Sequence, residues 1–399
     1  MVEAISVAFP PGYSATGGVL AFSDDDEAVV KLIETTSNGV GRRVNVTEDL
    51  VSSYIEDDYG QRALRDNGVA QAFASPVEES IKLFWSRRVG TYNGDMLPIP
   101  MNKELYTRLA PYARIPSVLP QILMNKTAIQ ICTEPQLPPH LCGMPRNTIR
   151  NEYLSFILQS IPGAMHHVCA GTSFTYHFPS RHMYIFMHGL ASVNYDRFSY
   201  AIQNGAAKDS AFLIPSIMIQ FRLERSSKLL DLWHDKVYWN ERKLGIRFDH
   251  HDNPDPAGID YTTLSKDVNA ANTDLAYLNW TCKTIVRQLD FMDDIAHRFR
   301  SQAVKNGTSD DAAAHTEHLL LETHAHLRSW NTGLADRAEY LSKRGQALVQ
   351  TVYSGIAQRD SAISLRLAAT STELAKTSHE VAISTSRDSA VYVPSTKFS

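Results

Sequence analysis

The sequence predicts an α+β protein: a small sheet-plus-helix head domain, then a helical region that ends in a long antiparallel two-helix stalk. Two observations lead to this prediction. Apolar residues recur at alternating steps of four and three through most of residues 259–390, the spacing of a helix that buries one stripe against a partner helix. Residues 76–209 instead hold short strand-like runs joined by proline-rich connections, as in a domain built around a sheet.

The bulk composition is that of a folded protein. Hydrophobic residues make up 43% and charged residues 21% of the 399, so general disorder is excluded. Lysine and arginine number 39 against 43 aspartates and glutamates, and this near balance predicts no nucleic-acid partner. The cysteines form no CxxC pair and the N-terminus lacks the pattern of a signal peptide, so we expect reduced thiols in the cytoplasm.

Residues 1–75 are predicted as a variable N-terminal segment. An acidic run, Asp24–Glu27, precedes Val29, Val30 and Ile33. Acidic residues favour a helix N-terminus, and the pattern therefore predicts a helix after Glu27.

Residues 76–209 are predicted as the α+β head. Four runs have strand character: residues 81–85, 128–131, 173–178 and 183–187. In the third, Phe174, Tyr176 and Phe178 alternate with polar residues, which is the period-two signature of a half-buried strand. Residues 151–161 show a helical pattern and are predicted as a helix between strands.

Residues 210–258 are predicted as a connecting helix and loop. Pro215 suits the first turn of a helix, where its missing N–H is no loss. Leucine and valine then recur every seven residues up to Leu244, and Gly245 closes the helix. The segment 249–258 is rich in Asp, Pro and Gly and is predicted as a loop.

Residues 259–390 are predicted as the stalk. Its first helix covers residues 262–304, about 65 Å, and its second covers residues 312–389, about 115 Å if unbroken. Asn306-Gly307 and Ser309 favour a tight turn between them. Three glycines, Gly333, Gly345 and Gly355, each weaken the second helix by about 1 kcal/mol relative to alanine and mark points where it could kink. The apolar series is Leu264, Val268, Ala271, Leu275, Leu278, Cys282, Ile285, Leu289, Met292, Ala296 and Phe299, then Leu320, Leu327, Leu334, Leu341, Leu348, Ile356, Ile363, Leu367, Leu374 and Val381.

No catalytic signature is present: the sequence contains no GxGxxG, Walker loop, HExxH or GxSxG motif. We therefore expect no enzyme and no catalytic or cofactor-binding residues. A lesser alternative is an enzyme with a pocket in the head domain, built from its histidines: His166, His167, His177 and His182.

A candidate metal site lies on the first stalk helix. Asp290 meets Asp293 and Asp294 at i+3 and i+4, so three carboxylates share one face. Mg²⁺ or Ca²⁺ would relieve their repulsion. Arg287, His297 or Arg298 could relieve it equally, and the sequence favours these internal partners over a cation.

Several short motifs resemble fungal CorA-like magnesium-transporter domain proteins. They are Phe212-Leu-Ile-Pro-Ser-Ile-Met218, Arg222-Leu-Glu-Arg225, Glu241-Arg-Lys-Leu-Gly245, Val352-Tyr-Ser-Gly-Ile-Ala-Gln-Arg-Asp360 and Ser384-Thr-Ser-Arg-Asp-Ser389. The resemblance covers residues 210–390 and implies a cytoplasmic head-and-stalk domain. In that family the long helix continues into two membrane spans, five chains surround a pore, and Gly-Met-Asn marks selectivity.

The sequence departs from that family at its end. Its Gly143-Met144 is followed by Pro145, and residues 391–399 form a polar tail with no apolar span. We therefore expect a CorA-like cytoplasmic domain without its own pore, acting through helix-mediated association with itself as a homo-oligomer or with full-length CorA-like relatives. The alternative is a truncated form of a divalent-cation transporter, located in the membrane.

Overall fold

The computed structural model describes residues 30–36, 41–53, 80–87, 99, 101–123, 127–160, 171–190, 192–202, 210–246 and 258–391. Within them the chain forms two compact units. The head unit comprises Met1–Ser227 and Trp280–Leu334, and the stalk unit comprises Lys228–Asn279 and Ala335–Ser399. The predicted α+β class is confirmed.

The head unit contains a seven-stranded sheet. Its strands are β1 (Val30–Thr36), β2 (Gly41–Asn45), β3 (Ser80–Arg87), β4 (Ile129–Thr133), β5 (Tyr153–Gln159), β6 (Gly171–His177) and β7 (His182–Leu190). Their spatial order is β2-β1-β3-β7-β6-β5-β4. The β3–β7 pair is parallel and the other pairs are antiparallel. All four strands predicted within residues 76–209 are confirmed.

Two helices predicted from local pattern are strands, so those predictions are wrong. Val30 and Ile33 belong to β1, which pairs with β2 on one side and β3 on the other, and their β-branched side chains suit that position. The acidic run before it lies outside the described residues. Most of the segment predicted as a helix at 151–161 forms β5. Helix α4 (Arg146–Glu152) ends at the residue before this strand begins. Since β5 is buried on both faces, it lacks the polar alternation that reveals a strand.

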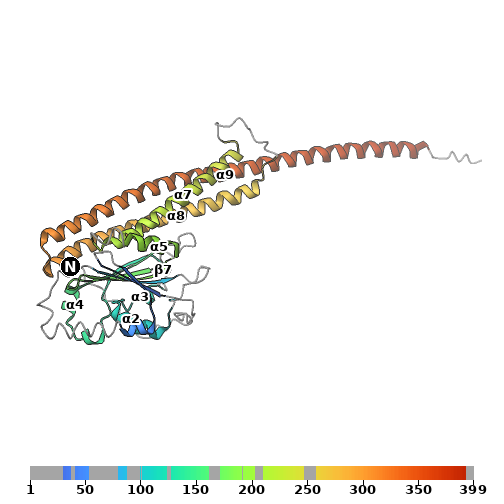
Figure 1. Ribbon diagram of the computed structural model, residues 1–399. Coiled ribbons are helices and arrows are strands. Elements are labelled where there is room, and N and C mark those ends of the chain that lie inside the picture. The colour runs from blue at the N-terminus through green and yellow to red at the C-terminus, as the bar shows by residue number, and fades with distance from the viewer. Residues whose placement is uncertain are drawn as a thin grey trace, which may run out of the picture. The chain divides into compact units, whose positions relative to one another are not determined.

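Helices cover both faces of the sheet. On one face, α2 (Lys103–Tyr112) and α3 (Leu119–Leu123) pack their apolar side chains against Leu32, Phe84 and Phe186. Figure 1 shows these two helices on one side of the sheet and α5 (Ser192–Ala201) on the other. The head-unit parts of α7 (Leu213–Lys243) and α8 (Tyr261–Lys305) lie on that second face. Aromatic contacts join the sheet to α8 and to the residue just before α7: Phe156 contacts Phe291, and Tyr176 contacts Phe299 and Phe212.

The predicted hairpin is present as α8 and α9 (Asp310–Val391). Gly307 has φ of +89°, the left-handed conformation that ends the first helix. The Ser309 hydroxyl accepts a hydrogen bond from the Ala312 N–H at the start of the second. The helices run antiparallel: Arg300 pairs with Asp310 near the turn, and Asn331 contacts Cys282 further along.

In the stalk unit, α9 packs against α7 and α8 through two apolar clusters. One joins Val237, Val268 and Leu348, and the other joins Tyr261, Leu264 and Val352. The two Arg344 nitrogens pair with the carboxylate of Glu241 beside the first cluster. All eleven apolar positions predicted for the first stalk helix are buried, and so are the five leucines from Leu320 to Leu348.

The glycines of α9 do not break the helix, which runs unbroken over 82 residues. Gly345 and Gly355 lie where a neighbouring side chain approaches closely. A Cβ at Gly355 would lie 2.5 Å from the Tyr261 ring, and one at Gly345 would overlap the amide of Asn272. At Gly333 the space is open.

Alanine substitutions at these glycines should therefore have opposite effects. Gly333→Ala should raise the free energy of unfolding by about 0.5–1 kcal/mol, because it adds helix propensity without contact. Gly355→Ala should lower it by about 1–3 kcal/mol, because the methyl group overpacks against Tyr261. Chemical denaturation of both variants measures this, and equal stabilisation by the two substitutions would contradict the close approach.

Candidate functional site

The three candidate metal-binding aspartates lie on α8 in the head unit, and two of them pair with Arg328 of α9. The Arg328 guanidinium donates to Asp290 at 2.8 Å and to Asp293 at 2.9 Å. Asp294 is exposed, and its charge acts on the Cys132 thiol, whose pKa is raised chiefly by burial. The described residues contain no group of three or more His, Cys, Asp or Glu side chains that could hold a metal ion.

The partner of Asp290 and Asp293 was not among those expected from the sequence. The basic residues that were expected to neutralise these carboxylates are near neighbours on the same helix: Arg287, His297 and Arg298. Arg328 comes from the antiparallel helix, nearly forty positions away in the chain. Only the tertiary pairing brings it to this carboxylate pair.

His324 lies at the centre of this polar cluster and is fully buried. Its Nδ1 is 2.8 Å from the Asp293 carboxylate, and its Nε2 is 3.2 Å from the Ser216 hydroxyl of α7. Burial lowers the pKa of His324, an effect that Asp293 opposes and Arg328 reinforces. The imidazole is therefore neutral near pH 7, with Nδ1–H donating to Asp293 and Nε2 accepting from Ser216.

His324 belongs to a second seven-residue repeat of buried positions on α9, beside the repeat of buried leucines. This second repeat was not predicted from the sequence. Four residues after each buried leucine of α9 comes another buried or closely packed position: His324, Asn331, Ala338, Gly345 and Val352. The signal was present as a seven-residue repeat, but its first four members are polar or small. Asn331 uses its amide to donate to the Cys282 carbonyl at 3.0 Å. A buried polar side chain with a partner in this position fixes the register of two helices.

Two of the head histidines lie on neighbouring strands. His177 and His182 face each other in the β6–β7 pair. His177 Nδ1 is 2.6 Å from the Ser180 hydroxyl, and His182 Nδ1 is 2.7 Å from the Ser80 hydroxyl. His166 and His167 lie outside the described residues. His177 and His182 thus each pair with a serine hydroxyl, and the pocket in the head domain stays a prediction.

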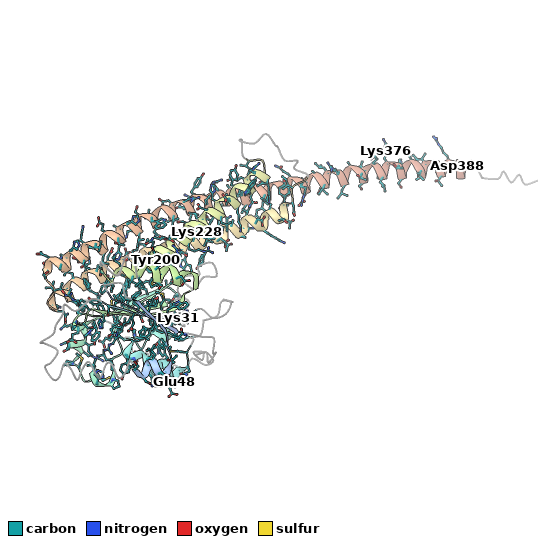
Figure 2. The ribbon with its side chains drawn as sticks, viewed as in Figure 1. Lys31, Glu48, Tyr200, Lys228, Lys376 and Asp388 are labelled. Carbon is teal, nitrogen blue, oxygen red and sulfur yellow. The ribbon has the colours of Figure 1, made fainter. Side chains whose placement is uncertain are left out.

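The last part of α9 is the feature that this fold leaves without an internal explanation. We call residues 357–388 the distal segment; every one of them is exposed. Four of its apolar residues form what we call the distal stripe: Ile363 (48% exposed), Leu367 (66%), Leu374 (70%) and Val381 (58%). Figure 2 shows the side chains of this segment, among them Lys376 and Asp388, projecting from the helix.

Seven-residue steps from the buried Leu348 and Val352 lead to Ala362 and Arg366, so the distal stripe, which begins with Ile363 and Leu367, is displaced by one residue from the buried repeats. The exposure of this part of α9 has a simple cause. The α8 helix begins at Tyr261, which lies against Gly355 and Val352. The α7 helix ends at Lys243. Beyond Ile356, therefore, neither neighbour in the stalk unit extends far enough along α9 to cover its apolar face.

Comparisons with known proteins give little beyond this geometry. A search against models of protein families finds no match, and a search of curated proteins finds none either. Among solved structures, the chain is similar to the full-length CmaX protein, with 14% sequence identity and a TM-score of 0.46, over 86% of this chain and 83% of that one. A similarity of that size assigns neither family nor function. No helix in the described part of the chain is both long and apolar enough to cross a membrane.

His324 should make stability depend on pH. Because its pKa in the folded state lies below the ordinary value of about 6.5, the unfolded chain takes up the proton first as the pH falls. The free energy of unfolding should therefore decline from pH 7.5 to pH 5.5 more steeply in the wild type than in His324→Gln. Urea denaturation at both pH values measures this, and parallel declines in the two proteins would contradict it.

Magnesium binding by Asp290, Asp293 and Asp294 stays a prediction, and Arg328 provides its test. Arg328→Ala removes the cation that neutralises two of the carboxylates, so Mg²⁺ should bind the variant about tenfold more tightly than the wild type. Titration calorimetry with MgCl₂ measures this. Arg337→Ala, which removes a different α9 ion pair with Asp231, is the control. Equal heats in all three proteins would rule out a latent cation site here.

Proposed function

We propose that this protein is a non-enzymatic, CorA-like domain that acts by helix-mediated association through the distal segment of α9. The observation that carries the proposal is the distal stripe. Ile363, Leu367, Leu374 and Val381 are spaced as a coiled-coil seam and are all exposed. A stripe of this kind on a helix that has no cover marks an interaction site.

The physical case rests on what an isolated helix of this length requires. The distal segment extends about 48 Å, and most helical stability in proteins comes from packing an apolar face rather than from propensity. Serine, threonine and histidine, which are not strong helix formers, are frequent in this segment. Packing the stripe against another helix would supply the missing stabilisation.

The polar residues of the seam suit burial as well. Thr370 and Thr377 fall at the seam positions between the distal apolar residues, and each hydroxyl donates to the carbonyl four residues earlier, at 2.9 and 3.0 Å. Their polar atoms are thus satisfied within the helix. Each threonine can then present its methyl group to a partner without leaving an unpaired hydroxyl.

The proposed compartment is the cytoplasm. Cys132, Cys142 and Cys282 are free thiols, and burial raises the pKa of Cys282 to about 11, which keeps it protonated and unreactive. Free thiols support a reducing compartment. The sequence resemblance to CorA-like domains over residues 210–390 agrees with the same location.

Removal of the stripe should abolish association. The double variant Leu367→Ser/Leu374→Ser should weaken self-association or partner binding by at least about a hundredfold, because two apolar side chains leave the seam. Light scattering of the full chain over a range of concentrations measures this. Leu365→Ser is the matched control, since Leu365 is 72% exposed but points away from the stripe. A wild-type chain that stays monomeric and binds no helix would contradict the proposal.

A further inference from the structure

We propose that the partner of the distal segment is a second copy of this chain, paired antiparallel, with Arg366 of each copy opposite Glu373 of the other. This inference rests on the proposed function and adds the identity, direction and register of the partner. The pattern of charges beside the distal stripe carries it.

Charged residues recur every seven positions immediately before the stripe. They are Arg359, Arg366, Glu373, Glu380 and Arg387, and each of the middle three directly precedes Leu367, Leu374 or Val381. In coiled-coil terms Leu367, Leu374 and Val381 occupy the a positions, and the charged residues occupy the g positions beside them. Charges at such flanking positions set partner choice and orientation.

An antiparallel pairing brings the g positions of the two helices face to face. The first two in the segment are basic and the next two are acidic, so reversing one helix sets basic against acidic. Arg366 of each copy then faces Glu373 of the other, and Arg359 faces Glu380. The two-fold axis makes each of these pairs occur twice.

The same register aligns the apolar core. Leu374 of one copy lies level with Ile363 of the other, Val381 with Ile356, and Leu367 with Thr370. Ile356 is half-buried and packs on the cluster of Tyr261, Leu264 and Val352. The proposed layer of Val381 on Ile356 therefore extends an apolar cluster that already exists in the stalk unit.

Other alignments of two copies have less charge complementarity. In a parallel pair each g position faces an e position, and these hold only neutral residues: Ser364, Ser371, Ser378 and Thr385. An antiparallel pair shifted by one heptad places Glu373 opposite Glu373 of the other copy, or Arg366 opposite Arg366, and keeps one kind of opposite-charge pair instead of two: Arg366 with Glu380, or Arg359 with Glu373. Like charges at close range disfavour both shifted registers.

An antiparallel pair of identical helices is also self-complementary. The same surface is used on both chains, so the contact is isologous and closes at two copies.

The distal segment carries no net excess of either charge: Arg359, Arg366, Lys376 and Arg387 balance Asp360, Glu373, Glu380 and Asp388. A strongly basic or acidic partner is therefore disfavoured relative to a second copy.

The inner pair is the better target for a test. Arg359 lies 5.6 Å from the centre of the Tyr261 ring and near Asp360 within its own chain, so changes there would disturb the stalk unit. The side chains of Arg366 and Glu373 are exposed on the distal segment. Charge reversal at these two positions should leave the folded units intact.

The experiment uses four charge variants of the full chain, with the dimer dissociation constant measured by sedimentation equilibrium. Arg366→Glu and Glu373→Arg each place like charges opposite one another twice, and each should weaken the dimer by at least about tenfold. The double variant Arg366→Glu/Glu373→Arg restores opposite charges and should return to within about threefold of the wild type. Lys376→Glu, which reverses a charge facing away from the stripe, is the control and should leave the constant unchanged.

Mixing the two single variants gives the sharpest result. Arg366→Glu carries two glutamates at the inner positions and Glu373→Arg carries two arginines, so an equimolar mixture should form a heterodimer as tightly as the wild type forms its homodimer. Recovery in the mixture and in the double variant supports the antiparallel register, because neither is expected from a parallel pair.

The failures of the two proposals are distinguishable. If Leu367→Ser/Leu374→Ser abolishes association while the single charge reversals bind like the wild type, the stripe associates but the antiparallel register is wrong. The same conclusion follows if the reversals weaken binding and neither the double variant nor the mixture recovers. If the wild type is a monomer and binds no helical partner, both the proposed association function and this inference are wrong.

Discussion

The antiparallel packing of α9 against α8 is the contact on which the rest of the structure depends. Every apolar position predicted for α8 and the five spaced leucines of α9 are buried. The turn at Gly307 and Ser309 sets the direction of the second helix. In the head unit the same α8 also packs aromatic side chains against the sheet, so that Phe291 and Phe299 contact Phe156 and Tyr176.

Polar residues inside this seam give it a unique alignment. His324 is fully buried between α7 and α8 and bonds to both, through Ser216 and Asp293. Asn331 bonds to the Cys282 carbonyl one further layer along. Such buried groups cost desolvation, and a shift by one heptad would leave each without its partner. The apolar heptads alone tolerate such a shift, since leucine follows leucine every seven residues.

Several charged and polar side chains of the described residues pair with one another inside the fold. Carboxylates on α8 and α9 meet arginines, as in the pairs of Asp290 with Arg328 and Asp310 with Arg300, and the head histidines His177 and His182 meet serines. The feature that extends beyond this internal pairing is the distal segment, where an apolar stripe and a matching charge pattern are both exposed. Interaction through that surface is consistent with a helix whose two neighbours end before it does.

The sequence by itself determined the α+β class, the two stalk helices to within a few residues, their turn, and the strands that alternate, such as β6. These features depend on local spacing and on residue conformation, both of which are present in the chain itself. Tertiary structure decided that Val30–Thr36 and Tyr153–Gln159 are strands, because pairing on both sides overrides a local helical pattern. It also decided which half of the apolar series in α9 is buried, since that depends on where α7 and α8 end beside it. Pairings such as Arg328 with Asp290 were equally beyond the sequence, because residues far apart in the chain become neighbours only when the hairpin closes.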